Sequence, residues 1–198
     1  FARLVDWQVQ SVQPAQAVFR LTDADVPPEM VDFPFRLQMS ITLNGSLSLA
    51  LEMVNLGFRP AVVSCALHTY LAVSNYENVC LTGLDNREFT VKDNPQRRLQ
   101  EGPLHPRGEI CSLFHDIAAP IVVHDPAWHR RITLHNRGSN TALVWNPGRQ
   151  RAGELSDIGE NNYQNLLCVE ANNASEDARI LLPLNPHCLS QTISIAEP

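Results

Sequence analysis

The residue best suited to acid/base chemistry is His68, which lies within an apolar, strand-like run covering residues 62–73. About a hundred residues later a second strand-like run, Leu166-Leu167-Cys168-Val169, ends in Glu170. An imidazole titrates near neutral pH, and partial burial would raise the pKa of a carboxylic acid toward the same range. The sequence therefore offers one histidine and one glutamate that could exchange protons with a bound substrate.

Simpler interpretations stay open for both residues. A histidine on a strand often only bonds to a backbone carbonyl, and a glutamate at a strand end often only faces water. The other histidines do not help to decide, because none has the HxH or HExxH spacing of a metal site. We therefore expect no bound metal.

A second candidate is the segment Val144-Trp145-Asn146-Pro147-Gly148, where a strand runs into a turn. An exposed tryptophan beside an asparagine can hold a sugar, because the ring stacks on apolar carbons while the amide bonds to hydroxyls. A packed Trp145 and a turn-forming Asn146 explain the same segment equally well. Trp145 and Asn146 are therefore candidate substrate contacts, and a purely structural role for both stays open.

Composition excludes several classes of protein. The 198 residues carry a formal net charge of -6, so the chain lacks the basic balance of a nucleic-acid-binding protein. No apolar stretch approaches the roughly 18 residues of a membrane span. The five cysteines are widely spaced and have no CxxC pair, which favours reduced thiols in a cytoplasmic protein. Lys92 is the only lysine, and the many arginines suit phosphate or carboxylate binding.

The elements that must position these residues have the two-residue period of strands. Residues 36–43 and 46–55 alternate polar and apolar side chains, and Asn44-Gly45 between them predicts a hairpin. A short helix or turn is expected over residues 150–157, and residues 85–107 look like a long polar excursion. Further strands are predicted at residues 7–12, 17–21, 60–70, 78–82, 121–124, 131–136, 141–146, 166–170 and 189–195.

Many short strands at close spacing, with 14 prolines and little helix, indicate an all-β fold. We expect an antiparallel sandwich or barrel that forms a single domain over residues 1–198. Neither an internal repeat nor a linker divides the sequence.

Taken together, the segments resemble the hexose-6-phosphate mutarotases, the glucose-6-phosphate 1-epimerase family. The motifs that carry the resemblance occur in the family's order and spacing over essentially the whole chain: Phe1-Ala2-Arg3, Ala66-Leu67-His68-Thr69-Tyr70, Leu81-Thr82-Gly83-Leu84, Val144-Trp145-Asn146-Pro147-Gly148, Ser156-Asp157, Cys168-Val169-Glu170-Ala171 and Ser190-Gln191-Thr192-Ile193.

The resemblance implies a large antiparallel β-sandwich of the galactose mutarotase type. It also implies interconversion of the α and β anomers of D-glucose 6-phosphate or a related hexose 6-phosphate, without a metal or cofactor. His68 falls on the family's acid/base histidine, Glu170 on its base, and Arg3 on an arginine of the substrate site. We expect a monomer whose partner is a hexose 6-phosphate.

The sequence departs from the family pattern in two places. Cys111 and Ser112 stand where the family usually has an Asp-Arg pair, and a thiol cannot accept hydrogen bonds as a carboxylate does. The family's glycine-rich region before Phe1 is absent, so amino-terminal strands are expected to be missing from the sandwich. Two alternatives to an active mutarotase follow: a catalytically weakened sensor or accessory protein that binds sugar phosphate, and a β-sandwich interaction domain in which His68 and Glu170 are structural.

Overall fold

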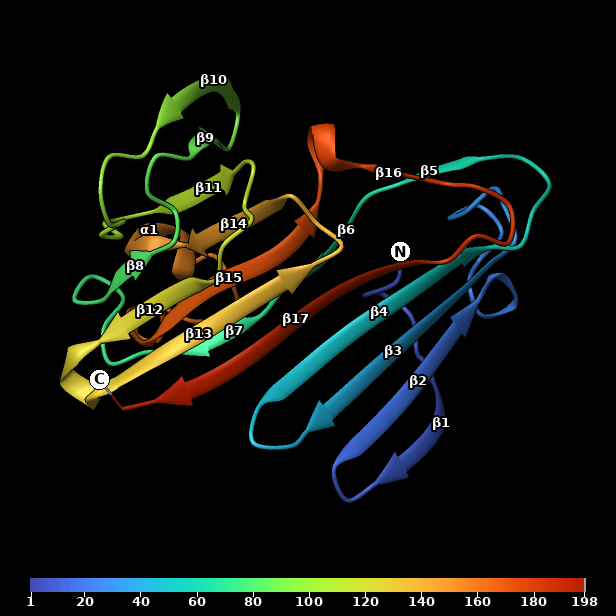
Figure 1. Cartoon of the computed structure of the whole chain (residues 1–198), viewed down its shortest axis with the longest axis horizontal. Coiled ribbons are helices and arrows are strands. Elements are labelled where there is room, and N and C mark those ends of the chain that lie inside the picture. Colours follow the sequence, from blue (N-terminus) through green and yellow to red (C-terminus); the bar gives the residue numbers. More distant parts are fainter. Residues whose placement is uncertain (198) are drawn as a thin grey trace.

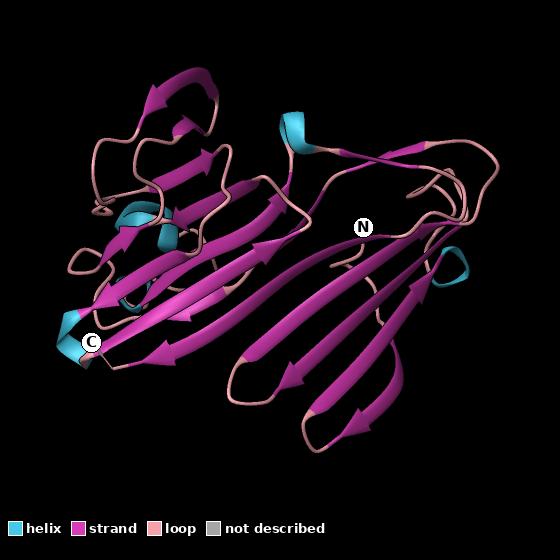
Figure 2. Cartoon of the chain, viewed as in Figure 1, coloured by secondary structure: helices cyan, strands magenta, loops and turns pink. Residues whose placement is uncertain are grey.

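The computed structural model describes residues 1–197, and their regular secondary structure is almost entirely antiparallel strands joined by loops (Figure 2). Two large sheets carry most of the strands, and a two-stranded sheet joins them at one end (Figure 1). The single α-helix of the described residues, α1, is short (Gly148–Ala152). The predicted all-β, antiparallel fold class is therefore confirmed.

The larger sheet has eight strands. Its order is β1 (Gln8–Gln13), β2 (Gln16–Thr22), β3 (Phe35–Leu43), β4 (Leu47–Asn55), β17 (His187–Ala196), β13 (Arg130–Arg137), β12 (Ile121–Asp125) and β8 (Cys80–Thr82).

The second sheet has seven strands and carries the candidate residue Glu170, and His68 lies between two of its strands. Its order is β10 (Asn94–Leu99), β9 (Glu88–Val91), β11 (Ile110–Phe114), β14 (Thr141–Asn146), β15 (Leu166–Asn173) and β6 (Cys65–Leu67), and β7 (Tyr70–Ala72) also pairs with β15. The small sheet pairs β16 (Arg179–Leu181) with β5 (Ala61–Val63). Four single-turn 3₁₀ helices connect strands: η1 (Asp23–Asp25), η2 (Pro126–Trp128), η3 (Tyr163–Asn165) and η4 (Ser175–Asp177).

Several predicted elements agree with the structure. The hairpin at Asn44-Gly45 joins β3 to β4, with Leu43 paired to Leu47 and Gly45 at a positive φ of 67°. The strand predicted at residues 141–146 coincides with β14. The short helix expected over residues 150–157 forms earlier, at α1.

Two predicted segments differ from the structure. The strand expected at residues 60–70 is divided into β5 and β6, which pair with different strands, and it ends before His68. The polar excursion at residues 85–107 contains the β9–β10 hairpin, whose Phe89 packs on buried Phe114 with ring centroids 5.2 Å apart. Asp93 makes the hairpin's turn at a positive φ of 60°.

The core has two adjoining parts. One lies between the eight-stranded and the seven-stranded sheet and is built from large apolar residues such as Tyr76, Phe114 and Leu134. The other packs β3 and β4 against β6 and β16, around Phe35, Met53 and Leu181. β15 contributes to both parts, because Leu167 and Val169 enter the first and Ala171 enters the second. This strand therefore ties the site to both parts of the core.

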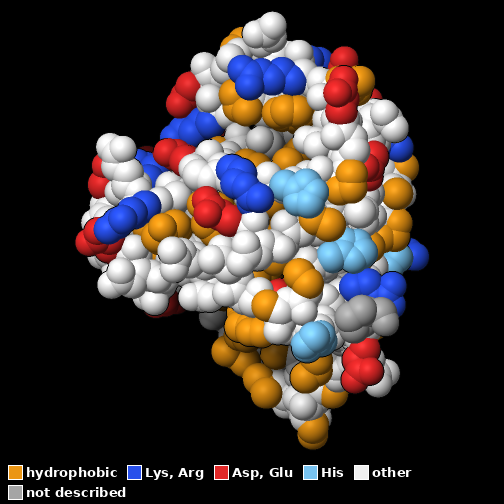
Figure 3. Space-filling view, turned by 90° about the vertical axis from the view of Figure 1, so that its left-hand side faces the viewer, with side chains coloured by type: hydrophobic (Ala, Val, Ile, Leu, Met, Phe, Trp, Pro, Cys, Tyr) orange, Lys and Arg blue, Asp and Glu red, His pale blue; other side chains and the backbone are white. Residues whose placement is uncertain are grey.

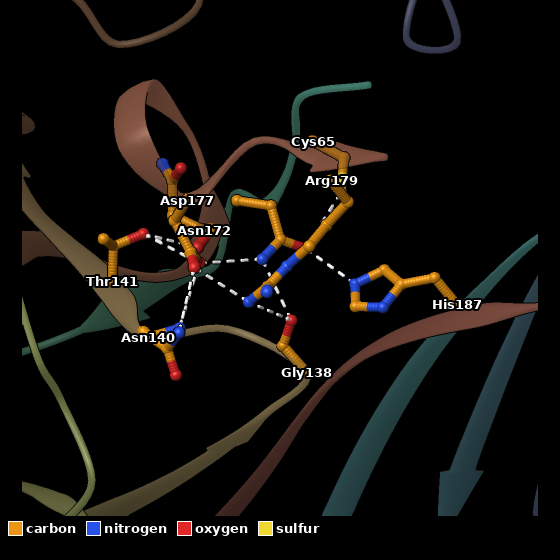
Figure 4. A network of polar contacts seen from close by, with 9 residues as sticks. Cys65, Gly138, Asn140, Thr141, Asn172, Asp177, Arg179 and His187 are labelled. Atoms are coloured by element: carbon orange, nitrogen blue, oxygen red, sulfur yellow. Dashed lines mark hydrogen bonds and ion pairs between the residues drawn. The ribbon is translucent and has the colours of Figure 1, made fainter. Parts of the chain in front are cut away.

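A buried carboxylate, Asp177, fixes the carboxyl end of β15 (Figure 4). It accepts hydrogen bonds from the Asn140 backbone N–H (2.9 Å) and the Asn173 amide (2.9 Å), and it pairs with Arg179 (2.8 Å). The Asn173 amide also donates to the Gly138 carbonyl (2.9 Å). The network thus joins the β13–β14 turn, the end of β15 and the start of β16.

The face shown in Figure 3 gives no sign of a basic patch. Lysine and arginine side chains alternate there with aspartate and glutamate, and hydrophobic side chains gather at the lower end of the view. Among residues 1–197, no helix is both long and apolar enough to cross a membrane.

We predict that Asp177→Ala lowers the free energy of unfolding by about 3–5 kcal/mol, because it leaves Arg179 and two amide donors without their buried acceptor. Urea unfolding followed by circular dichroism measures the loss. Glu176→Ala is the matched control, since the neighbouring Glu176 side chain is 74% exposed and its pairing with Arg97 should be worth under about 1 kcal/mol. Equal losses in the two variants would contradict the assigned role of Asp177.

Candidate active site

Strand pairing brings the candidate residues to one face of the seven-stranded sheet. Successive side chains of a strand point to opposite faces, so Cys168, Glu170 and Asn172 face away from the core that Leu167, Val169 and Ala171 enter. Along this face Cys111 lies opposite Trp145, Trp145 opposite Cys168, and Cys168 opposite Tyr70. The register therefore places Cys111 and Trp145 on the same face as Glu170.

His68 lies in a break between β6 and β7, both of which pair with β15. The Thr69 N–H turns back to the Leu67 carbonyl (3.0 Å), which interrupts the ladder at this point. The interruption lets the imidazole reach across to Glu170, with 3.2 Å between His68 Nε2 and Glu170 Oε1. The histidine side chain is 44% exposed, whereas that of Glu170 is only 4% exposed. The pair thus has one accessible member and one buried member.

Burial sets the acidity of Glu170. Removal from water disfavours the carboxylate and raises the pKa of Glu170 to about 7, although the Asn172 side chain opposes the shift. A carboxyl group with this pKa exists in both protonation states at neutral pH. It can therefore accept a proton and return it.

The environment of His68 favours the neutral ring. Burial lowers its pKa below the ordinary value, the charge of Arg3 acts in the same direction, and the residue's own backbone carbonyl opposes both. The other ring nitrogen, Nδ1, lies 3.6 Å from the Cys168 sulfur. Both ring nitrogens thus have a polar neighbour on β15.

Two aromatic rings surround the imidazole. Tyr70 stacks against it with centroids 4.8 Å apart, and Trp145 meets it edge-on at 5.8 Å. Tyr70 remains about half exposed and can offer its ring to a ligand. Aromatic faces beside a proton-transferring pair are suited to the apolar carbons of a sugar ring.

Two further predicted residues, Arg3 and Cys111, lie in the neighbourhood of the pair. Arg3 and His68 both line a cavity of about 900 Å³ between the amino-terminal segment and the faces of β3 and β4. Cys111 is partly buried, which raises the pKa of its thiol, and the negative charge of Glu170 acts in the same direction. The thiol is therefore neutral near pH 7. All five cysteines, Cys65, Cys80, Cys111, Cys168 and Cys188, are free.

The placement of Asn146 does not agree with a substrate contact. The residue is fully buried, its amide donates to the carbonyls of Tyr163 and Leu166 (both 2.8 Å), and its oxygen accepts from the Gly148 N–H (2.8 Å). Its polar atoms are used to close the turn after β14. Because adjacent strand residues point to opposite faces, Asn146 cannot share the face of Trp145.

Sequence reasoning missed three residues of the site: Tyr70, Cys168 and Asn172. Each lies two positions from His68 or Glu170, so the two-residue period of a strand could have indicated all three. Within residues 1–197, no three His, Cys, Asp or Glu side chains gather in a way that could hold a metal ion.

Comparison with known proteins identifies the family. The family model for aldose 1-epimerase matches residues 1–187, so the chain belongs to that family. It is 27% identical over 185 residues to a curated protein of Cenchrus ciliaris and 24% identical over 202 residues to one of Escherichia coli K12, both named "Putative glucose-6-phosphate 1-epimerase". These alignments cover 86% and 100% of this chain.

Solved structures agree on the fold. A "putative mutarotase" from Salmonella typhimurium superposes with a TM-score of 0.90 at 22% identity, covering 100% of this chain and 67% of the other. A protein from Synechocystis sp. PCC 6803 gives a TM-score of 0.81 at 20% identity, with 100% and 68% covered. The chain spans 56% of the length of the Cenchrus relative and 67% of that of the Escherichia relative.

The raised pKa of Glu170 predicts a pH-dependent stability difference between the wild type and Glu170→Gln. Between pH 4.5 and about 7 the folded protein holds this proton more tightly than the unfolded chain does. The wild type therefore loses stability as the pH rises through this window, by at most about 3 kcal/mol from this group, and the amide does not. Urea unfolding of both proteins at pH 4.5 and pH 8 measures the change, and a difference that does not vary with pH would contradict the assignment.

Proposed function

We propose that this chain carries the acid/base pair of a mutarotase that interconverts the α and β anomers of a hexose 6-phosphate. The observation that supports the proposal most is the 3.2 Å contact between His68 and the buried Glu170. The aldose 1-epimerase family supplies the reaction class. The proposed 6-phosphate specificity is supported by two curated relatives, each named "Putative glucose-6-phosphate 1-epimerase".

The reaction requires one base and one acid on the same sugar. The Glu170 carboxylate takes the proton of the hydroxyl on C1, the C1=O bond forms, and the bond between C1 and the ring oxygen breaks. Protonated His68 gives its proton to the ring oxygen, which becomes a hydroxyl. After rotation about the C1–C2 bond the two transfers reverse, and the ring closes on the other face of C1.

The pair needs a single proton to perform this cycle. With one proton shared between them, Glu170 and His68 can exist as carboxylate and imidazolium, the forms that ring opening consumes. After ring opening the pair still holds one proton, which is now on Glu170 as a carboxylic acid, and His68 is a neutral imidazole. Ring closure then restores the starting forms, so no proton has to be taken from solvent.

Arg3 and the aromatic rings would hold the substrate. Arg3 lies in the cavity wall with His68 and Tyr70, where a guanidinium can bond a phosphate with two parallel hydrogen bonds. Tyr70 and Trp145 would contact the apolar edge of the sugar.

A second candidate function, sugar-phosphate binding with weak or no catalysis, is favoured by Cys111. Its thiol lies on the site face, opposite Trp145. A thiol is a weak acceptor, so hydroxyl groups of the sugar would be held less firmly than by a carboxylate. A change in the phosphorus resonance of glucose 6-phosphate on addition of the protein, without anomer exchange, is the result that this alternative expects.

We expect the 198-residue chain to accelerate anomer exchange of glucose 6-phosphate in two-dimensional NMR exchange spectroscopy. His68→Asn and Glu170→Gln should each lower the rate by about 10²–10⁴-fold, because each removes one partner of the proton transfer. His129→Asn and Glu176→Gln are matched controls on exposed residues and should leave the rate unchanged. No acceleration by the wild type over buffer would overturn the proposed reaction.

The shared proton also predicts a bell-shaped pH dependence of kcat/KM. Above the Glu170 pKa of about 7 the pair loses its last proton, and no acid remains for the ring oxygen. At low pH, below the lowered pKa of His68, the pair holds two protons and no base remains. Exchange rates between pH 4 and pH 9 test this expectation, and a rate that continued to rise above pH 8 would exclude the one-proton scheme.

A further inference from the structure

The gap in pairing that positions His68 leaves part of β15 without a strand partner on that side. β6 pairs with Ala171 to Asn173 and β7 pairs with Leu166 to Cys168, so Val169 and Glu170 fall between them. The Val169 N–H is satisfied by the Thr69 carbonyl at 3.3 Å. The Val169 carbonyl, however, needs a donor from elsewhere, because buried carbonyls are rarely left unpaired.

That donor is Gln191, which comes from β17 of the opposite sheet. Its side chain is fully buried, and its amide nitrogen donates to the Val169 carbonyl at 3.0 Å. The same nitrogen donates to the Asn136 side-chain oxygen at 3.0 Å, and the amide oxygen accepts from the Thr69 hydroxyl at 2.6 Å. Each polar atom of the Gln191 side chain is therefore engaged.

Two of the three partners adjoin the proposed acid/base pair. Thr69 follows His68 in the chain, and Val169 precedes Glu170. Gln191 thus connects the turn that carries the acid to the strand that carries the base, from the side of the sheet opposite the substrate. A buried amide with every bond satisfied has one low-energy orientation, so it can fix the relative position of the two segments.

We propose that Gln191, acting through Thr69 and the Val169 carbonyl, is a positioning residue that sets the separation of His68 and Glu170. The inference rests on the proposed function, because it gives the two residues their roles. It assigns no substrate contact to Gln191. Proton transfer is sensitive to such positioning, since a misplacement of about 1 Å can cost about 100-fold in rate.

The test removes one bond of this link and keeps the shape. Thr69→Val loses the hydroxyl that donates a hydrogen bond to the Gln191 amide oxygen, while Thr69→Ser retains it. We expect Thr69→Val to lower kcat for anomer exchange by about tenfold with KM changed less than twofold. Thr69→Ser should have the kcat of the wild type. Thr192→Val is the matched control, because it also removes a hydroxyl with one hydrogen bond (3.1 Å to Ser48) from β17, next to Gln191 in the chain. It should leave kcat unchanged.

A second measurement does not depend on activity. The ring ¹⁵N signals of His68 report its contact with Glu170, and they should shift in Thr69→Val, return in Thr69→Ser and stay unchanged in Thr192→Val. If the wild type is inactive, the proposed function fails. The ¹⁵N signals still test whether Gln191 and Thr69 position His68 against Glu170, because they do not depend on activity. If Thr69→Val does not fold, Thr69→Ala removes the same hydroxyl without adding a methyl group. Wild-type His68 signals in the folded variant, or equal kcat losses in Thr69→Val and Thr192→Val, would overturn the proposal.

Discussion

The structure depends on β15 being buried on both of its faces. From Leu167 to Asn173 every residue of this strand is buried, although only alternate side chains enter the core. The opposite face carries Cys168, Glu170 and Asn172, and there His68 contacts Glu170 while Trp145 and Tyr70 lie on either side of Cys168. A strand in this position cannot slip by one residue, because a slip would exchange the apolar and polar sets between the two faces.

The same constraint gives Glu170 its chemical character. A carboxylate in a strand is normally directed to water, but here the neighbouring strands and rings exclude water from it. Burying this carboxylate is unfavourable in free energy. The surrounding contacts offset that cost, and they include the Asp177 network at the end of β15 and the two parts of the core. Removing the charge would relieve that cost and would also remove the proposed base, so stability and the proposed activity oppose each other at this position.

Sequence reasoning reached those features that depend on local pattern. Alternation predicted most strands, and Asn44-Gly45 predicted the β3–β4 hairpin, because strand period and turn preference are local properties. The break at His68 could not be predicted in this way. Its Thr69 hydroxyl is bonded to Gln191, which follows Thr69 by 122 residues and lies in the other sheet. The β9–β10 hairpin was missed for a related reason, since only tertiary packing of Phe89 on Phe114 distinguishes it from a polar loop.

The break between β6 and β7 has a consequence for how the molecule meets other chains. These two short strands are the last on their side of the seven-stranded sheet, where a straight strand would offer a row of free backbone donors and acceptors. The turn at Thr69 interrupts that row after three residues, so an extended segment of another protein finds no continuous template there. The turn that directs His68 toward Glu170 therefore also makes this edge a poor template for pairing with a strand of another chain.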